Sequence, residues 1–200
     1  MCLYLKMTMN MRCIRIKLKW ELNVSILSLI IFFNCSAEYK YELMLRKELA
    51  SGKQYDSLFL GIRFGMSSKE FYNHCWKLNK DKLIKQGSEN NTVLYKIKNF
   101  KYPTNMNFYP TFQNDKIVRM PVSFTYASWS PWNRDTFSSK LVIEVKSLME
   151  KWYGIGFLEL EDEKGLPLWV KIDGNRKIQI KIISEKDVRV DFTDLSKTIK

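Results

Sequence analysis

Residues 112–126 have the sequence FQNDKIVRMPVSFTY, and this stretch decides the class of fold. Every second residue from Val118 to Tyr126 is apolar, which is the period of a β-strand with one buried side. Asn114-Asp115 precedes the run and predicts a hairpin turn, because both residue types tolerate the backbone angles of such turns. A strand that is apolar on one side indicates an antiparallel sheet with one buried face.

The same alternation recurs on both sides of this stretch. It predicts further strands at residues 58–64, 93–97, 106–112, 157–158, 168–172, 178–182 and 188–192. Asp173-Gly174 adds a second hairpin signal.

Two helices interrupt the strands. Ser67 and Glu70 form a capping box, so a helix is expected to begin there and to end before Gly87. Its expected buried residues are Phe71, Cys75, Trp76 and Leu78. Ser130-Pro131 predicts the start of a second helix, which ends at Gly154. Its apolar stripe consists of Phe137, Leu141, Val145, Leu148 and Trp152.

These elements define an α+β fold, an antiparallel sheet of seven or eight strands with two helices packed on one face. The domain is expected to span residues 57–195 and to consist of two similar helix-plus-meander halves, 57–128 and 129–195. Residues 38–56 are expected to be a tether with a short helix ending near Gly52. The second face of the sheet is left open to solvent or to a partner.

The N-terminal region has the pattern of a secretory signal. Its basic part contains Lys6, Arg12, Arg15, Lys17 and Lys19, interrupted only by Glu21 at its end. Residues 24–33 carry no charge, and Asn34-Cys35-Ser36-Ala37 follow them. A membrane-spanning helix needs about 20 apolar residues. The shorter run therefore favours a signal peptide over residues 1–37 and an exported protein.

Two processing routes, besides a retained anchor, remain open. Residues 32–35 resemble a bacterial lipobox, which implies cleavage before Cys35 and acylation of its thiol, although Asn34 replaces the usual small residue. Cleavage after Ala37 would instead release a soluble secreted protein. The first route is preferred, which predicts an outer-membrane or periplasmic-side lipoprotein.

The charge of the chain restricts its partners. Removing the five basic groups and one acidic group of residues 1–37 lowers the formal net charge from +12 to +8. Such a surface favours an envelope protein or an anionic surface as partner. Nucleic acid is not expected, because the protein is predicted to be exported.

Two short motifs carry a resemblance to known families. Residues 64–71, FGMSSKEF, resemble the helix start of small envelope lipoproteins of the SmpA/OmlA outer-membrane-assembly type. Residues 112–117, FQNDKI, are similar to the hairpin of the same proteins. The tandem halves are also similar to the β-lactamase-inhibitor-protein-like fold. The resemblance implies a non-enzymatic, protein-binding role in the envelope, and no functional residue except Cys35 is carried over.

Aromatic and basic residues out of register with the buried strand positions are the candidate binding residues. Phe59, Tyr109 and Trp169 are expected on the open face of the sheet, near the basic residues Arg119, Lys171, Lys177 and Lys181. Binding surfaces are enriched in aromatic residues and arginine. We therefore assign partner binding to Tyr109, Arg119, Trp169, Lys171 and Lys181. Trp129 and Trp132 are expected to close the core between the halves.

The chain offers little for catalysis. His74 and Cys75 are adjacent on a helix, which suits neither a metal site nor a triad, and no cofactor is predicted. The acidic group Glu159, Glu161, Asp162 and Glu163 fits a solvated turn. The expected function is a non-catalytic binding or adaptor role through the open sheet face. The alternatives are an envelope polysaccharide hydrolase with paired carboxylates and a small-molecule or lipid carrier with an apolar cavity.

Overall fold

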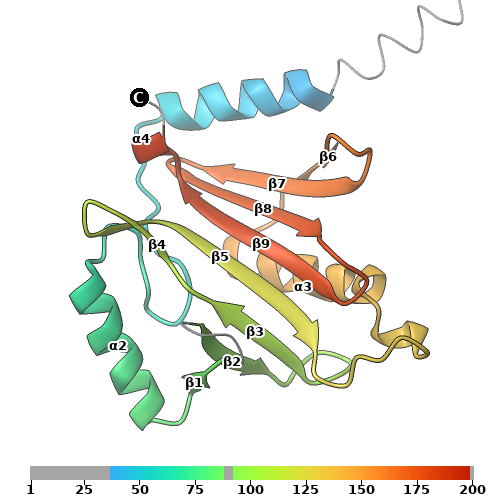
Figure 1. Cartoon of the computed structure of the whole chain (residues 1–200). Coiled ribbons are helices and arrows are strands. Elements are labelled where there is room, and N and C mark those ends of the chain that lie inside the picture. Colours follow the sequence, from blue (N-terminus) through green and yellow to red (C-terminus); the bar gives the residue numbers. More distant parts are fainter. Residues whose placement is uncertain (1–36, 88–91, 199–200) are drawn as a thin grey trace, which may run out of the picture. The chain divides into compact units, whose positions relative to one another are not determined.

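A computed structural model describes residues 37–87 and 92–198 (Figure 1). The predicted signal segment before Ala37, including Cys35, lies outside the described residues. The chain divides into two units, Met1–Glu42 and Leu43–Lys200. Residues 37–50 are helical, and the turn after them contains Gly52, as the sequence predicts.

An antiparallel sheet forms the centre of the second unit, which confirms the predicted α+β fold (Figure 1). Eight of its nine strands follow one path in the order β1-β2-β3-β5-β9-β8-β7-β6, and β4 pairs with β5. The strands are β1 (Ile84–Gln86), β2 (Val93–Ile97), β3 (Thr104–Phe108), β4 (Thr111–Gln113), β5 (Lys116–Tyr126), β6 (Leu158–Glu161), β7 (Pro167–Asp173), β8 (Arg176–Ile182) and β9 (Asp187–Asp194).

The last strand of each half lies at the centre of the sheet. β5 from the first half pairs with β9 from the second, with Val122 opposite Val190. The predicted hairpin at Asn114-Asp115 is confirmed, because both residues have positive φ and Gln113 pairs with Lys116. The two meanders therefore join into one continuous sheet.

The predicted capping box begins the first helix, α2 (Ser68–Lys80). The Ser67 hydroxyl accepts from the Glu70 backbone N–H, and the Glu70 carboxylate accepts from the Ser67 backbone N–H at 2.7 Å. These hydrogen bonds to Ser67 hold the pKa of Glu70 below its usual value. Phe71 is buried as predicted, whereas Trp76 is 75% exposed, so its predicted burial is wrong.

The second helix, α3 (Ser138–Tyr153), packs on β5, β8 and β9 and ends before Gly154 as predicted. Its predicted start at Ser130-Pro131 is wrong. A turn and the 3-10 helix η1 (Arg134–Thr136) come first, and the buried Ser138 donates its backbone N–H to the carbonyl of Glu185. The backbone donors before α3 are therefore used by turns and by a neighbouring loop. A short helix, α4 (Leu195–Thr198), follows β9.

One core lies between the helices and the sheet. Phe71 of α2 and Leu141 and Val145 of α3 belong to the same buried cluster. The sheet contributes Met106, Phe108, Met120, Val122, Phe124, Ile178, Ile180, Val188, Val190 and Phe192. Fully burying one such side chain stabilises a fold by about 1.5–3 kcal/mol. α3 thus buries its apolar side against one face of the sheet, and α2, beside β1, adds Phe71 to the same core.

The predicted strand at residues 58–64 is wrong. Ser57 and Arg63 form an isolated bridge, and the chain between them turns back on itself at Leu60-Gly61. Leu60 and Gly61 both have positive φ, and no extended strand can pass through two such residues. Phe59 is buried against the rings of Phe108 and Phe192, so it does not lie on the open face.

Candidate binding surface

The face of the sheet opposite the core is here called the outer face. In β5, Met120, Val122 and Phe124 point into the core, so the residues between them lie on the outer face. The pairing register extends this face across the central strands, where Arg119 lies opposite Thr193 of β9 and Thr193 lies opposite Lys177 of β8.

Asp191 is the centre of this face. Its side chain is only 8% exposed, and Arg119 contacts it through Nη2 at 2.9 Å from Oδ1. Arg189 approaches the same carboxylate through Nε at 3.3 Å. A buried carboxylate needs such partners, because an unpaired charge away from water is costly. Each guanidinium carries five N–H donors, so donors remain on Arg119 and Arg189 for a ligand.

Two lysines of β8 extend the basic surface. Lys181 lies opposite Arg189 of β9. Lys177 lies opposite Thr193 of β9, which in turn lies opposite Arg119 of β5. Burial lowers the pKa of Lys177, the positive charge of Arg119 lowers it further, and Asp191 acts in the opposite direction. We call Arg119, Lys177, Lys181 and Arg189 the outer basic cluster.

Carboxylates balance this cluster only in part. Asp162, in the turn after β6, lies close enough to Lys181 to interact with its charge. Asp191 is shared between two arginines, and Asp187 at the end of β9 is bonded to Thr125 and Ser184. The centre of the outer face therefore carries an excess of positive charge, and the buried Leu168, Val170 and Ile172 of β7 lie beside it.

The structure brings together only part of the predicted binding set. Arg119 and Lys181 lie on the outer face. Trp169 and Lys171 lie on the opposite side, because β7 pairs Trp169 with the core residue Ile180 and Lys171 with Ile178. The predicted placement of Trp169 and Lys171 on the open face is wrong.

Tyr109 also points away from the outer face. Its ring packs edge-to-face on Phe71 and Phe112, beside the core. Its hydroxyl contacts the Tyr72 hydroxyl, and this hydrogen bond together with burial raises the pKa of Tyr109 to about 12. Tyr109 therefore joins α2 to the loop between β3 and β4.

Sequence reasoning overlooked two residues of the surface, Arg189 and Asp191. Both alternate with the buried Val188, Val190 and Phe192 in β9, so the alternation itself placed them opposite the core. What the alternation could not show is that Asp191 pairs with Arg119 of β5, since that contact joins residues 72 positions apart.

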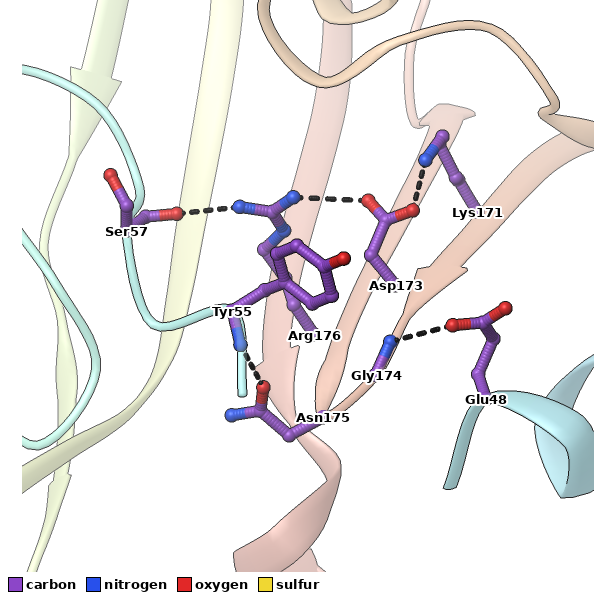
Figure 2. A network of polar contacts seen from close by, with 8 residues as sticks. All are labelled: Glu48, Tyr55, Ser57, Lys171, Asp173, Gly174, Asn175 and Arg176. Atoms are coloured by element: carbon purple, nitrogen blue, oxygen red, sulfur yellow. Dashed lines mark hydrogen bonds and ion pairs between the residues drawn. The ribbon is translucent and has the colours of Figure 1, made fainter. Parts of the chain in front are cut away.

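A second polar network holds the predicted tether to the β7–β8 hairpin (Figure 2). Tyr55 donates its backbone N–H to Asn175 Oδ1 at 2.6 Å. Glu48 accepts from the backbone N–H of Gly174 at 3.0 Å. These contacts give residues 48–57 fixed partners on the hairpin.

Arg176 is the main side chain of this network (Figure 2). Its Nη1 donates to the Ser57 carbonyl at 2.7 Å, and its Nη2 donates to Asp173 at 3.0 Å. Lys171 contacts the same Asp173 carboxylate. The Arg176 guanidinium also lies 4.6 Å from the centre of the Tyr153 ring. The predicted binding residue Lys171 is thus 9% exposed and already paired.

The remaining reactive side chains have structural partners. His74 contacts the Leu60 carbonyl through Nε2 at 2.6 Å and so supports the turn at Leu60-Gly61. Burial raises the pKa of the Cys75 thiol to about 11, which keeps it protonated near neutral pH. Among residues 37–87 and 92–198, no group of three or more His, Cys, Asp or Glu side chains could hold a metal ion.

Of the acidic residues predicted to form a turn, Glu159 and Glu161 instead lie in β6, and only Asp162 and Glu163 follow it in the turn before β7. Asp162 accepts from the backbone N–H groups of Lys164 and Leu166, each at 2.9 Å, and these bonds lower its pKa. Glu159 accepts from the indole N–H of Trp169 at 3.1 Å. Both carboxylates are therefore used in local hydrogen bonds.

Comparisons with known proteins return no match from family models, from curated proteins or from solved structures. In the part of the chain that the structure describes, no helix combines the length and the apolar character needed to cross a membrane.

Proposed function

We propose that this chain is an exported, non-catalytic binding protein of the cell envelope, and that its outer basic cluster holds an acidic segment of another envelope protein. The observation that carries the proposal is the placement of Arg119, Lys177, Lys181 and Arg189 around the buried carboxylate of Asp191. Lys177 supports the proposal further. Burial and the charge of Arg119 lower its pKa, and a bound carboxylate would stabilise its charged form.

Charge and shape favour a protein partner over a substrate. The cluster lies on the neighbouring strands β5, β8 and β9, where its four basic groups can bind several carboxylates of one extended segment at once. Complementary charge of this kind speeds association and selects partners. A glycosidase would need two carboxyl groups about 5–10 Å apart on either side of a sugar bond.

The export signal and the lipid anchor are part of the proposal. Cys35 is the acylation site that the lipobox-like sequence predicts. Metabolic labelling with a fatty-acid analogue should label the protein, and Cys35→Ala should abolish the label. A labelled Cys35→Ala variant, or an unlabelled parent protein, would contradict the anchor and would leave the binding surface unaffected.

Binding of a fluorescein-labelled decaglutamate peptide tests the surface. Lys177→Gln combined with Lys181→Gln should weaken binding about tenfold, because two such ion pairs contribute up to about 1 kcal/mol each and 1.4 kcal/mol corresponds to tenfold. The lysines are chosen because Asp191 keeps both of its arginines in this variant. Added salt should weaken binding in the parent protein.

The matched control is Lys69→Gln combined with Lys164→Gln, which removes the same charge from two exposed positions outside the sheet face. It should retain the parent affinity. Equal losses in the two double variants would show that only net charge matters, and that result would exclude the outer basic cluster as a site.

A further inference from the structure

A groove separate from the outer basic cluster lies between α3 and the edge of the sheet. It has a volume of about 1180 Å³ and is bordered by α3 on one side and by β1, β2 and their flanking residues on the other. Ligand sites of proteins have volumes of about 300–1,000 Å³, so the groove is large enough for a small molecule.

The inner surface of the groove is apolar. Ile84, Tyr95 and Ile97 line it from the sheet, and Leu148 lines it from α3. Ile84 lies opposite Tyr95 in the register, which places both on one side of the β1–β2 pair. An acyl chain or another apolar group would lose contact with water against these side chains.

Large apolar residues also remain exposed at the rim. Ile143 of α3 is 65% exposed, Leu83 before β1 is 51% exposed, and Trp152 of α3 is 38% exposed. All three line the groove. Apolar side chains that gather around a concave surface mark binding sites more often than isolated ones do.

The charges at the groove are almost all positive. Five lysines line it, Lys82, Lys85, Lys96, Lys98 and Lys151, and within the described residues none of them forms an ion pair. Lys85 and Lys96 alternate with Ile84 and Tyr95, so they lie on the other side of the β1–β2 pair from the apolar floor. Lys82 and Lys98 flank the two strands and Lys151 belongs to α3, so these three lysines border the groove from both walls.

Among the residues that the structure describes, Glu144 is the one acidic residue that lines the groove, and it already has hydrogen-bond partners. Glu144 accepts from the backbone N–H of Lys101 at 2.7 Å and from the Tyr126 hydroxyl. Glu144 therefore links α3 to β5 through Tyr126. Its carboxylate is used in these hydrogen bonds and does not neutralise the lysines of the groove. Burial, followed by the hydrogen bond to Glu144, raises the pKa of Tyr126 and keeps this hydroxyl a donor.

We infer that the groove binds a single anionic amphiphile, an acyl chain that ends in a phosphate or carboxylate group. The apolar floor would bind the acyl chain, and Lys82, Lys98 and Lys151 would bind the head group. The groove lies at the β1–β2 edge of the sheet and against α3, whereas the outer basic cluster lies on β5, β8 and β9. The inference is independent of the proposed function.

Dodecyl phosphate, kept below the concentration at which it forms micelles, is the probe. Calorimetry with the whole processed protein should detect its binding, about tenfold or more tighter than that of dodecyl maltoside or inorganic phosphate, because only dodecyl phosphate offers both the chain and the charge. Equal affinity for inorganic phosphate would reduce the groove to a site for anions, and equal affinity for dodecyl maltoside would reduce it to an apolar patch. Either result would overturn the inference.

Variants assign the binding to the groove. Lys98→Glu with Lys151→Glu should weaken dodecyl phosphate about tenfold or more, whereas Lys69→Glu with Lys164→Glu, an equal change in charge, should not. Ile143→Ser should also weaken dodecyl phosphate and leave inorganic phosphate unaffected; its side chain is exposed, so the fold should persist.

Two further results complete the test. Lys177→Gln with Lys181→Gln should bind dodecyl phosphate like the parent protein, which separates this site from the outer basic cluster. An acidic amphipathic peptide that binds at Lys98 and Lys151 while dodecyl phosphate does not would show that the groove serves a protein, and would overturn the inference.

Discussion

Arg176 combines several interactions in one buried side chain. It donates to Asp173 and to the Ser57 carbonyl and lies over the Tyr153 ring. Arg176→Ala would leave Asp173 with Lys171 alone and the Ser57 carbonyl without its donor. Breaking a buried ion pair costs about 3–5 kcal/mol. We expect a loss of this size in the free energy of unfolding, measured by urea denaturation, and nearly as much for Arg176→Lys, which cannot span both partners.

An exposed ion pair provides the comparison for Arg176. Arg63 lies 3.8 Å from Glu70, and both side chains are more than half exposed. Solvent screens such a pair, so Arg63→Ala should change stability by less than about 1 kcal/mol. If Arg176→Ala behaved like Arg63→Ala, the network would not hold the segment before Leu58 to the hairpin.

The face on which a single residue lies was predicted correctly where the alternation within its own strand was sufficient. Arg119 and Lys181 lie on the outer face because each alternates with buried neighbours in its own strand. Trp169 and Tyr109 could not be placed in this way. Trp169 depends on the register between β7 and β8, and Tyr109 lies in the connection between β3 and β4.

The β7–β8 hairpin makes tight contact with the segment before Leu58. Gly174 has φ +52°, and a Cβ added there would lie 2.2 Å from the Lys53 carbonyl oxygen. Gly174→Ala should therefore displace residues 53–57 in addition to straining the turn. Gly165→Ala is the matched control, because Gly165 has φ +71° and no atom within 4 Å of the added Cβ.

The left-handed conformation alone costs about 1–2 kcal/mol. Gly165→Ala should lower the free energy of unfolding by that amount, measured by thermal or urea denaturation. Gly174→Ala should lower it clearly more. Hydrogen exchange should also show faster exchange of the Tyr55 backbone N–H in Gly174→Ala, because its acceptor is Asn175 of the same hairpin. Equal losses in the two variants would contradict the contact.

The same hairpin explains why the face of β7 was predicted incorrectly. Its two-residue loop pairs Asp173 with Arg176, so even-numbered residues of one strand lie opposite odd-numbered residues of the other. The apolar residues of β8 that enter the core are even-numbered, and Leu168, Val170 and Ile172 therefore lie on the outer face. A shift of one residue in register moves every side chain to the other face. Alternation within each strand was correct, and the length of the turn determined how the strands combine.

Short apolar runs limit prediction in another way. Residues 58–64 alternate like a strand, yet Phe59 is buried as well as Leu58, so the period is not that of a one-sided strand. The turn depends on left-handed angles at Leu60-Gly61 and on the contact of His74 with the Leu60 carbonyl. That contact joins residues 14 positions apart, and local periodicity does not contain it.

At the scale of the whole second unit, the two halves share their most buried elements. β5 and β9 pair along seven residue positions at the centre of the sheet. Phe192 of β9 contacts Phe59 of the first half at 5.7 Å and Tyr153 of α3 at 5.4 Å between ring centres. The two meanders were predicted from sequence periodicity, but their connection through β5 and β9 was not, since alternation does not specify which strands become neighbours.

This arrangement predicts that the halves unfold together. Phe192 is 1% exposed, and Phe192→Ala should cost about 3–5 kcal/mol, because a large cavity would open at the junction. Native-state hydrogen exchange should show an equal loss of protection in β2 of the first half and β8 of the second, since both depend on the same core. Ile155 is 84% exposed, so Ile155→Ala should change neither the free energy of unfolding nor the protection of β2 and β8. Loss of protection in β8 alone, with β2 unchanged, would show that the halves are separate folding units joined by a weak pairing of β5 and β9.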